Sequence, residues 1–439
     1  MSLNKLQLLV KNVIGARLDI EFGKTIATEK TLAVPELEAS ELTRFIQENE
    51  LTNNEVVTLI MALLPHISPE YLSSIISDYL PNGGEFPEFG GVKGKNHRGI
   101  LPTGETVLYV LAGRDPELRN KLLPLFAEDH LFARKEILYL EEVPAGEPRM
   151  SGKLIMDQEY VELFTTGKIS KPKLSCDFPA QYIETDLVWD DLILNKKTSS
   201  QIAEIETWLN HNEVLLNDWG MKSRIKPGFR VLFTGLPGTG KTLTATLLGK
   251  YTHRDVFRID LSLVVSKYIG ETEKNLSKLF DRARHKNWIL FFDEADAIFG
   301  KRTSIRDAHD KYANQEVSYL LQRIESHEGL VILASNMKNN IDSAFTRRFN
   351  AIIEFENPTA EERLKLWNSN IPDQVQLEDK IVLEDLARKY EVNGANIVNI
   401  IHYACLKTIE NRSTRIKYLD LLNGIQKEYI KEGKFINFR

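Results

Sequence analysis

The sequence predicts an α/β fold in which a parallel sheet flanked by helices is followed by a small helical domain. Two observations carry this prediction. Short apolar segments alternate with helix-period stretches in the middle of the chain, at residues 230–234, 256–260, 288–292, 330–334 and 351–355. Such alternation is typical of βαβ units, whose strands run parallel. After Pro358 only helix-period patterns remain, which predicts helices over the last part of the chain.

The pattern divides the chain into three regions. Residues 183–358 carry the predicted sheet, and residues 359–439 carry the helical domain. Residues 1–180 are mixed and mainly helical: apolar residues at helical spacing reach Leu80, and a Gly- and Pro-rich loop follows over 81–104. This first region contains no zinc, calcium-loop or serine-hydrolase pattern, so we interpret it as the part that binds a partner.

The composition predicts a folded cytoplasmic protein without a membrane span. The chain has 439 residues, of which 42% are hydrophobic and 27% charged, close to the globular average. Its apolar runs are far shorter than the roughly 18 residues of a membrane span, and the N-terminus lacks a secretory cleavage site. The two cysteines, Cys176 and Cys405, have no metal or redox spacing, so we expect free thiols in a reducing compartment.

The charge balance argues against a nucleic-acid partner. The chain has 56 Lys and Arg residues against 62 Asp and Glu residues, and its formal net charge is −6. No overall basic field is therefore available to hold nucleic acid or an anionic membrane, although a local basic groove stays open.

The first candidate site is a glycine-rich loop after the first apolar segment. Residues 235–242, GLPGTGKT, match the phosphate-loop pattern between a predicted strand and a predicted helix. In such a loop backbone N–H groups converge on an anion at a helix N-terminus. Lys241 is expected to reach the β- and γ-phosphates, and Thr242 to offer a hydroxyl to Mg²⁺. The expected ATP contacts in this loop are Gly235, Pro237, Gly238, Thr239, Gly240, Lys241, Thr242 and Leu243.

A pair of carboxylates ends the third apolar segment. Asp293 and Glu294 follow residues 288–292, a segment that can lie near the phosphate-loop strand in the sheet. Asp293 is expected to hold Mg²⁺, directly or through water, and Glu294 to polarise the attacking water as general base. By itself an acidic pair at a strand end is commonly a simple turn, and the phosphate loop upstream favours the catalytic interpretation.

Together these motifs resemble those of the AAA+ ATPases, and within them the clade of katanin, spastin and other substrate-threading enzymes. The resemblance extends from about Thr185 to the C-terminus. It implies a P-loop sheet with a helical lid, and Mg²⁺-dependent ATP hydrolysis. Further segments that match in the family's order are SKYIGETE at 266–273, ASN at 334–336, IDSAFTRRF at 341–349 and GAN at 394–396.

The resemblance assigns roles to residues outside the two nucleotide motifs. Asn336 corresponds to the sensor, a neutral amide able to hydrogen-bond the water or the γ-phosphate. Arg347 and Arg348 correspond to arginine fingers, which stabilise charge on the phosphoryl group bound by a neighbouring subunit; which of the two dominates stays open. A finger acting between subunits requires a closed homo-oligomer, which we expect to be a hexamer.

The resemblance also implies a central pore. Lys267, Tyr268 and Ile269 match the first pore loop, in which an aromatic ring grips an extended polypeptide; simple packing of Tyr268 is the alternative. Two further segments concern the nucleotide. Gly394 and Ala395 match the lid segment of the site, and Asp191 and Leu192 are interpreted as bordering the adenine.

A narrower resemblance concerns bacterial AAA+ ATPases encoded beside extracellular contractile injection systems. It depends on residues 258–276, 293–302 and 309–325. It suggests a bacterial cytoplasmic protein that acts on a component of such a particle.

The sequence thus predicts a ring-shaped ATPase that remodels, disassembles or threads a protein partner. The alternative is an ATP-gated assembly scaffold that binds partners without threading them. A DNA-dependent ATPase is a third class, and it is disfavoured by the net charge of −6.

Overall fold

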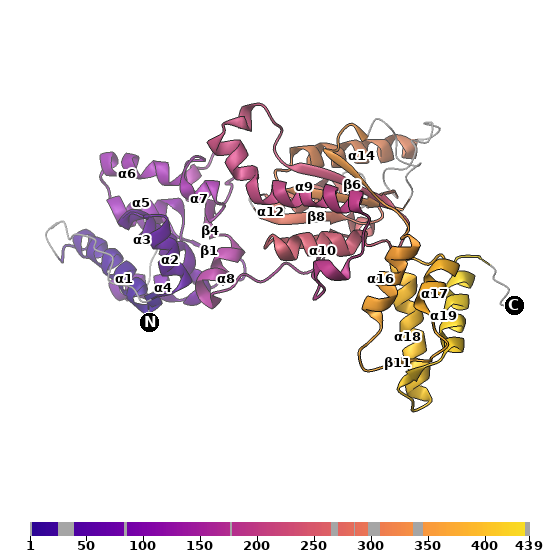
Figure 1. Ribbon diagram of the computed structural model, residues 1–439. Helices are drawn as coiled ribbons and strands as arrows, with labels where there is room; N and C mark the ends of the chain where they lie inside the picture. Colours follow the sequence, from indigo (N-terminus) through magenta and orange to yellow (C-terminus); the bar gives the residue numbers. More distant parts are fainter. Residues whose placement is uncertain are drawn as a thin grey trace. The chain divides into compact units, whose positions relative to one another are not determined.

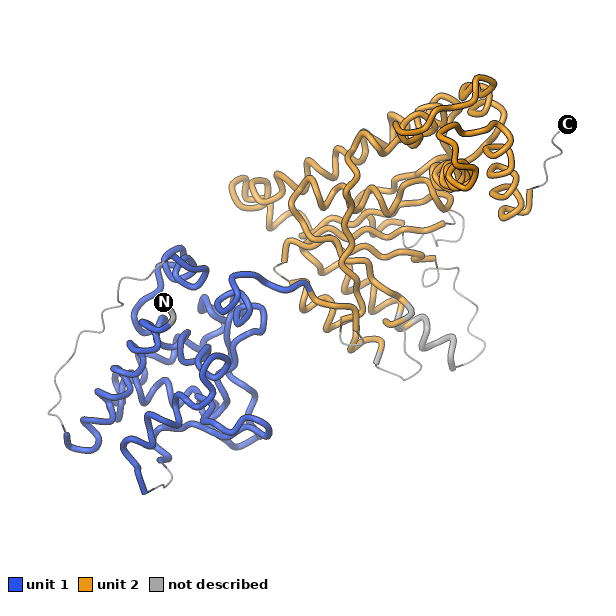
Figure 2. The backbone as a smooth tube through the Cα atoms, turned by 90° about the horizontal axis from the view of Figure 1, so that it is seen from below, with its two compact units in different colours: residues 1–171 blue, residues 172–439 orange. Residues whose placement is uncertain are grey.

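The computed structural model of the chain describes residues 2–24, 39–82, 86–175, 178–264, 271–284, 286–296, 308–336 and 346–434. These residues form two compact units, 1–171 and 172–439 (Figure 2). In each unit apolar side chains from several elements are buried together.

Unit 1 is mainly helical. Helix α3 is its centre, because all of its residues from Val56 to Leu64 are buried. Thr52 caps α3 and forms a reciprocal capping box with Glu55, which fixes where the helix begins. The helices are α1 (Ser2–Glu21), α2 (Glu41–Glu48), α3 (Asn53–Ile67), α4 (Tyr71–Tyr79), α5 (Gly104–Ala112), α6 (Pro116–Leu122), α7 (Leu131–Arg134) and α8 (Gln158–Thr166).

Two small antiparallel pairs complete unit 1. Strand β1 (Val92–Lys93) pairs with β2 (Ile100–Leu101), and β3 (Leu138–Leu140) pairs with β4 (Leu154–Met156). The first pair lies inside the segment 81–104 that the sequence suggests to be a loop. Strands of two residues are too short to give a periodic signal.

Among the described residues no single helix is long and apolar enough to cross a membrane. Helices α3 and α4 pass that test only together, and they are bent by 103° relative to each other.

Unit 2 contains a six-stranded sheet with the order β10-β6-β9-β8-β7-β5. All neighbours are parallel except β5, which pairs antiparallel with β7 at the edge. The predicted fold class, a mainly parallel sheet flanked by helices, is confirmed. Strand β5 is not among the sequence-predicted strands. The strands are β5 (Ala180–Ile183), β6 (Phe229–Gly235), β7 (Asp255–Ile259), β8 (Trp288–Phe292), β9 (Leu330–Ser335) and β10 (Ala351–Phe355).

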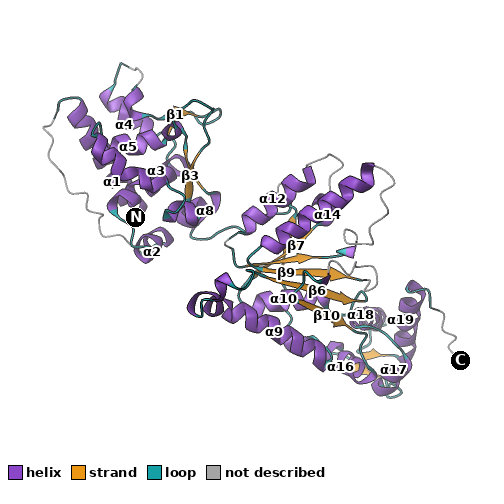
Figure 3. Cartoon of the chain, turned by 90° about the horizontal axis from the view of Figure 1, so that it is seen from above, coloured by secondary structure: helices purple, strands orange, loops and turns teal. Residues whose placement is uncertain are grey.

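Helices cover both faces of this sheet (Figures 1 and 3). Helices α12 (Glu271–Ala283) and α14 (Ala308–Ser326) pack on one face, whereas α9 (Lys196–Glu213) and α10 (Lys241–Tyr251) pack on the other. Successive residues of β8 alternate between the two cores, as strand geometry requires: Leu290 and Phe292 face one, Ile289 and Phe291 the other. A strand buried on both faces therefore reads as a continuous apolar run.

A helical subdomain follows the sheet. It consists of α16 (Ala360–Asn370), α17 (Leu383–Lys389), α18 (Gly394–Glu410) and α19 (Tyr418–Lys431), with a short parallel pair, β11 (Gln376–Leu377) and β12 (Arg415–Ile416). Its core includes Trp367, which is fully buried. Helices after Pro358, as the sequence predicts, are confirmed.

The sheet order determines where a site can form. Strand β9 lies between β6 and β8, and the carboxyl ends of these three parallel strands meet at one edge. The phosphate loop follows β6, the acidic pair follows β8 and Asn336 follows β9. Ligands of open α/β sheets bind at this edge.

His327, which follows α14, makes stability depend on pH. Its side chain is 8% exposed, and burial, together with nearby Arg323 and Arg230, lowers its pKa to about 4. In the unfolded chain the histidine titrates near a pKa of about 6.5. As the pH falls from about 6.5 towards 4, the unfolded state takes up a proton that the folded state does not. The free energy of unfolding then falls, by up to roughly 3 kcal/mol.

We expect His327→Leu to flatten this dependence. Urea unfolding between pH 7 and pH 5 should show a smaller loss of stability for the variant than for the unmodified chain. His402→Leu, at an exposed position of α18, is the control and should retain the full slope. Equal slopes for His327→Leu and the unmodified chain would contradict the prediction.

Candidate active site

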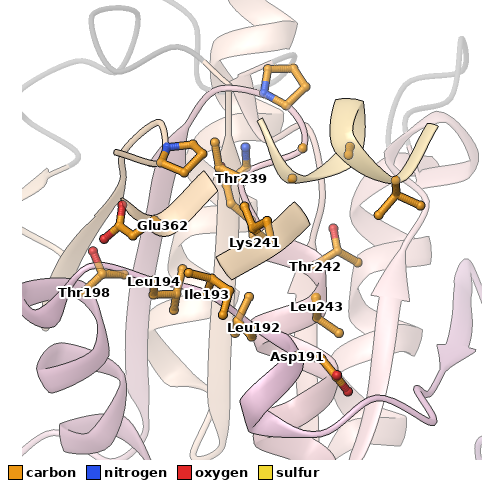
Figure 4. Close-up of a pocket in the computed structure, with 18 of the residues that line it drawn as sticks. Asp191, Leu192, Ile193, Leu194, Thr198, Thr239, Lys241, Thr242, Leu243 and Glu362 are labelled. Carbon is orange, nitrogen blue, oxygen red and sulfur yellow. The ribbon is translucent and has the colours of Figure 1, made fainter. Parts of the chain in front are cut away.

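A cavity of about 530 Å³ lies at the carboxyl edge of the sheet, and the helical subdomain forms part of its wall (Figure 4). It brings together residues that the sequence analysis selected from several separate segments. The lining includes Asp191, Leu192, Pro237, Gly238, Thr239, Gly240, Lys241, Thr242, Leu243, Asp293, Glu294, Asn336, Gly394 and Ala395.

Lys241 lies at the first position of α10 and is buried, with 7% of its surface exposed. Its ammonium group donates to the carbonyls of Gly235 at 2.7 Å and Leu236 at 3.0 Å, and to Oδ1 of Asn336 at 3.0 Å. Burial lowers the pKa of Lys241, against the opposing effect of the carboxylates of Asp293 and Asp296. A buried cation is thus fixed where an anionic ligand would enter.

The loop before Lys241 has the conformation that its glycines permit. Gly240, the residue before α10, has φ of 101°, in a region that side-chain-bearing residues rarely adopt. A Cβ at this position would also lie 2.8 Å from Cδ1 of Leu192. The first N–H groups of α10 are therefore not shielded by side chains at this turn, which suits phosphate binding.

The acidic segment after β8 is tied to β9. The N–H of Ala295 donates to the carbonyl of Ala334 at 2.8 Å, and Asp296 accepts from the backbone N–H of Asn336 at 3.2 Å. Glu294, directly before Ala295, has φ of 51°, a left-handed conformation that costs a non-glycine residue on the order of 1 kcal/mol. The general-base candidate is exposed and lines the cavity.

The arginine pair is placed differently. Neither Arg347 nor Arg348 lines this cavity. Arg348 forms an ion pair with Glu325 at the end of α14, whereas exposed Arg347 makes no hydrogen bond or ion pair with any other described residue. The segment that follows the pair is anchored to β6, because Asn350 Oδ1 accepts from the N–H of Arg230 at 2.9 Å.

Some sequence-selected residues are not brought into this cavity. Gly235 ends β6 and its carbonyl accepts from Lys241, although it is absent from the cavity lining. The proposed pore residues Lys267, Tyr268 and Ile269 lie outside the described residues.

Sequence reasoning missed several residues of the site. Asp296 holds the backbone of Asn336, and its place two residues after Glu294 was the available signal. Asn393 caps α18 and contacts the phosphate loop; the pair of asparagines three residues apart, at 393 and 396, was a capping signal. Other lining residues missed are Leu187, Ile193, Leu194, Asn195, Thr198, Glu356, Pro358, Glu362, Leu366, Ser369, Asn370 and Val398.

The fold and the site together define a P-loop nucleoside triphosphatase. Residues 231–357 match the family model described as "ATPase family associated with various cellular activities (AAA)". The chain therefore contains an AAA ATPase domain, as its motifs predict.

Three relatives illustrate the similarity. The chain is 35% identical over 213 residues to the ATPase family gene 2 protein of Schizosaccharomyces pombe, covering 46% of this chain and 26% of the relative. It is 32% identical over 258 residues to the human katanin p60 ATPase-containing subunit of the A-like 1 type, covering 55% and 49%. It is 30% identical over 218 residues to the proteasome-activating nucleotidase of Saccharolobus solfataricus, covering 48% and 55%. The chain thus spans a quarter to about half of these relatives' length.

Proposed function

We propose that this protein hydrolyses ATP in the cavity at the carboxyl edge of the sheet and uses the energy, as a ring-shaped homo-oligomer, to remodel, disassemble or thread a protein partner. The observation that carries the catalytic part is the convergence of Lys241, Glu294 and Asn336 on one cavity. These are the groups that phosphoryl transfer requires: a cation for the phosphates, a base for water and a polar group to orient them.

The cavity suits ATP. Its volume lies in the usual range of small-molecule sites, and it combines the N-terminus of α10 with apolar side chains such as Leu192, Ile193 and Val398. We assign the phosphates to the loop and α10. We assign the adenine to the side bordered by Asp191, Leu192, Gly394 and Ala395.

Mg²⁺ fits the same site. Thr242 and Asp293 both line the cavity, whereas the described residues contain no group of three or more Asp, Glu, His or Cys side chains able to hold a metal. This is the donor set expected for Mg²⁺, which usually takes one or two protein ligands, phosphate oxygens and water. When bound, the ion supplies positive charge on the phosphates.

The chain's own residues divide the remaining work. Glu294 takes a proton from the attacking water as general base. Lys241, already desolvated, stabilises negative charge on the phosphates, and Asn336 positions the reacting groups through its amide. Asp296 holds the backbone of Asn336 and so keeps this amide in place.

Several features support an oligomer that acts on protein. Arg347 is exposed and does not line its own chain's cavity, so a finger role requires a neighbouring subunit. The family resemblance supports a hexamer with Lys267, Tyr268 and Ile269 in its pore. Unit 1 and the segment that joins it to the sheet then serve partner binding. We further propose a cytoplasmic location, where ATP is available, and a component of a contractile injection particle as the partner.

A capture experiment tests the partner. Glu294→Gln protein is immobilised in lysate of the native organism with ATP or with ADP, and retained proteins are identified by mass spectrometry. Capture of sheath, tube or baseplate components only with ATP supports the injection-particle assignment. Capture of a different protein set overturns that assignment and keeps the remodelling function, and the absence of any ATP-dependent partner favours the scaffold.

Two further measurements test the motor itself. Light scattering of Glu294→Gln in ATP should give the mass of a hexamer, and a persistent monomer at micromolar concentration would contradict the ring. Tyr268→Ala should retain basal ATP hydrolysis and lose remodelling. Retained remodelling would contradict threading and favour the scaffold.

A further inference from the structure

The carbonyls of the phosphate loop show how the lid, the helical subdomain of residues 360–431, contacts the loop. Because the loop turns N–H groups towards the ligand, carbonyls must point away and need other partners. Lys241 satisfies the first two, those of Gly235 and Leu236. The lid satisfies the next two: Nδ2 of Asn393 donates to Pro237 at 3.1 Å, and the N–H of Ala395 donates to Gly238 at 3.4 Å.

Asn393 performs two tasks with its two side-chain ends. Its Oδ1 accepts from the N–H of Asn396 at 2.9 Å and caps α18, while Asn396 Oδ1 accepts from the N–H of Asn393 at 3.1 Å. This reciprocal capping leaves the Nδ2 group free to reach the loop. The N-cap residue of a lid helix is thus also a ligand of the phosphate loop.

The contact is closely packed and rigidly supported. A Cβ on Gly238 would lie 2.7 Å from both the Cβ of Ala395 and Oδ1 of Asn393, so the loop surface fits the start of α18 without room for a side chain. Within the lid, Nδ2 of Asn396 donates to Glu428 of α19 at 3.0 Å. Movement of α18 is therefore transmitted to the loop backbone.

We infer that Asn393 is a positioning residue that fixes the phosphate loop against the lid and thereby slows the release of bound nucleotide. The inference rests on the proposed nucleotide site. It assigns Asn393 no contact with the reacting atoms, so its effect falls on binding and release rather than on the chemical step.

The two tasks of Asn393 can be separated by substitution. Ser and Asp both cap helices well, yet neither has a side-chain N–H group that can donate to Pro237. Asn393→Ser should therefore retain the cap and lose the contact with the loop. Asn399→Ser, on the same helix but away from the loop, is the matched control for changes in helix stability.

The test measures release of the fluorescent nucleotide mant-ADP by stopped flow, together with KM and maximal turnover for ATP. Asn393→Ser should release mant-ADP roughly two- to tenfold faster and raise KM by a similar factor, the scale of one hydrogen bond. Maximal turnover should stay within about twofold, as expected when only binding is affected. Asn393→Asp should also release mant-ADP faster, and Asn399→Ser should match the unmodified protein.

Amide hydrogen exchange gives a readout that needs no nucleotide. Exchange of the segment 393–397 should be faster in Asn393→Ser than in Asn399→Ser, while other segments of the lid stay unchanged. Unchanged mant-ADP release in Asn393→Ser, with normal binding by the unmodified protein, would overturn this inference alone. Failure of the unmodified protein to bind mant-ADP would overturn the proposed function, and the role in nucleotide release with it.

Discussion

Replacing Glu294 by Gln is expected to lower ATP turnover by roughly 100- to 10,000-fold, the usual contribution of a general base, while ATP binding survives. The amide has nearly the shape of the carboxylate but cannot accept a proton from water at neutral pH. The backbone reason is equally direct: the left-handed conformation at this residue costs Gln about as much as Glu, so the fold should not change.

The measurement is single-turnover hydrolysis of ATP together with equilibrium binding of a fluorescent ATP analogue. Glu356→Gln is the matched control, because Glu356 is another exposed carboxylate that lines the same cavity. The control should retain turnover within a few-fold. Equal losses in both variants would show that general negative charge in the cavity, rather than a positioned base, explains the effect.

The central strands can be predicted from sequence because each is buried on both faces. Every residue of β8 is buried, so the strand reads as five consecutive apolar residues. The phosphate loop is equally legible, because its spacing follows from the geometry of one bound phosphate group. Strand β5 is different: only its first residue is fully buried, and it forms at an edge where pairing with β7 decides its conformation.

The residues that sequence analysis missed act across long chain separations. Asn393 meets Pro237 from 156 positions away, and Asp296 holds Asn336 from 40 positions away. Neither contact leaves a local pattern. Asn393 reads locally as a helix cap, and only the folded chain shows that its second side-chain end reaches the loop. The catalytic groups thus follow from spacing, whereas the groups that position them follow from tertiary contacts.

Arg347→Ala is expected to lower turnover by about 1,000-fold in the assembled protein, the lower end of the range for an arginine finger. Arg348→Ala should lower it only a few-fold. The reason is their surroundings: Arg348 is held by Glu325 of its own chain, whereas Arg347 is exposed and free to reach a neighbour. Loss of the partly exposed Arg348–Glu325 pair should cost at most about 1 kcal/mol of stability.

Steady-state turnover above the concentration of assembly compares the two variants. Light scattering confirms that each still assembles, which separates loss of the finger from loss of the ring. Glu325→Gln is a useful third variant, because it frees Arg348 without removing it. A larger loss in Arg348→Ala than in Arg347→Ala would reverse the assignment of the finger.

Mixing two inactive variants separates action between subunits from action within one. In a ring of Arg347→Ala and Glu294→Gln subunits, some sites combine the intact Glu294 of an Arg347→Ala subunit with the intact Arg347 of its neighbour. Turnover should therefore return in part when the two proteins are mixed. If Arg347 acted on the nucleotide of its own subunit, every subunit in the mixture would still lack one essential group, and no mixture would regain turnover.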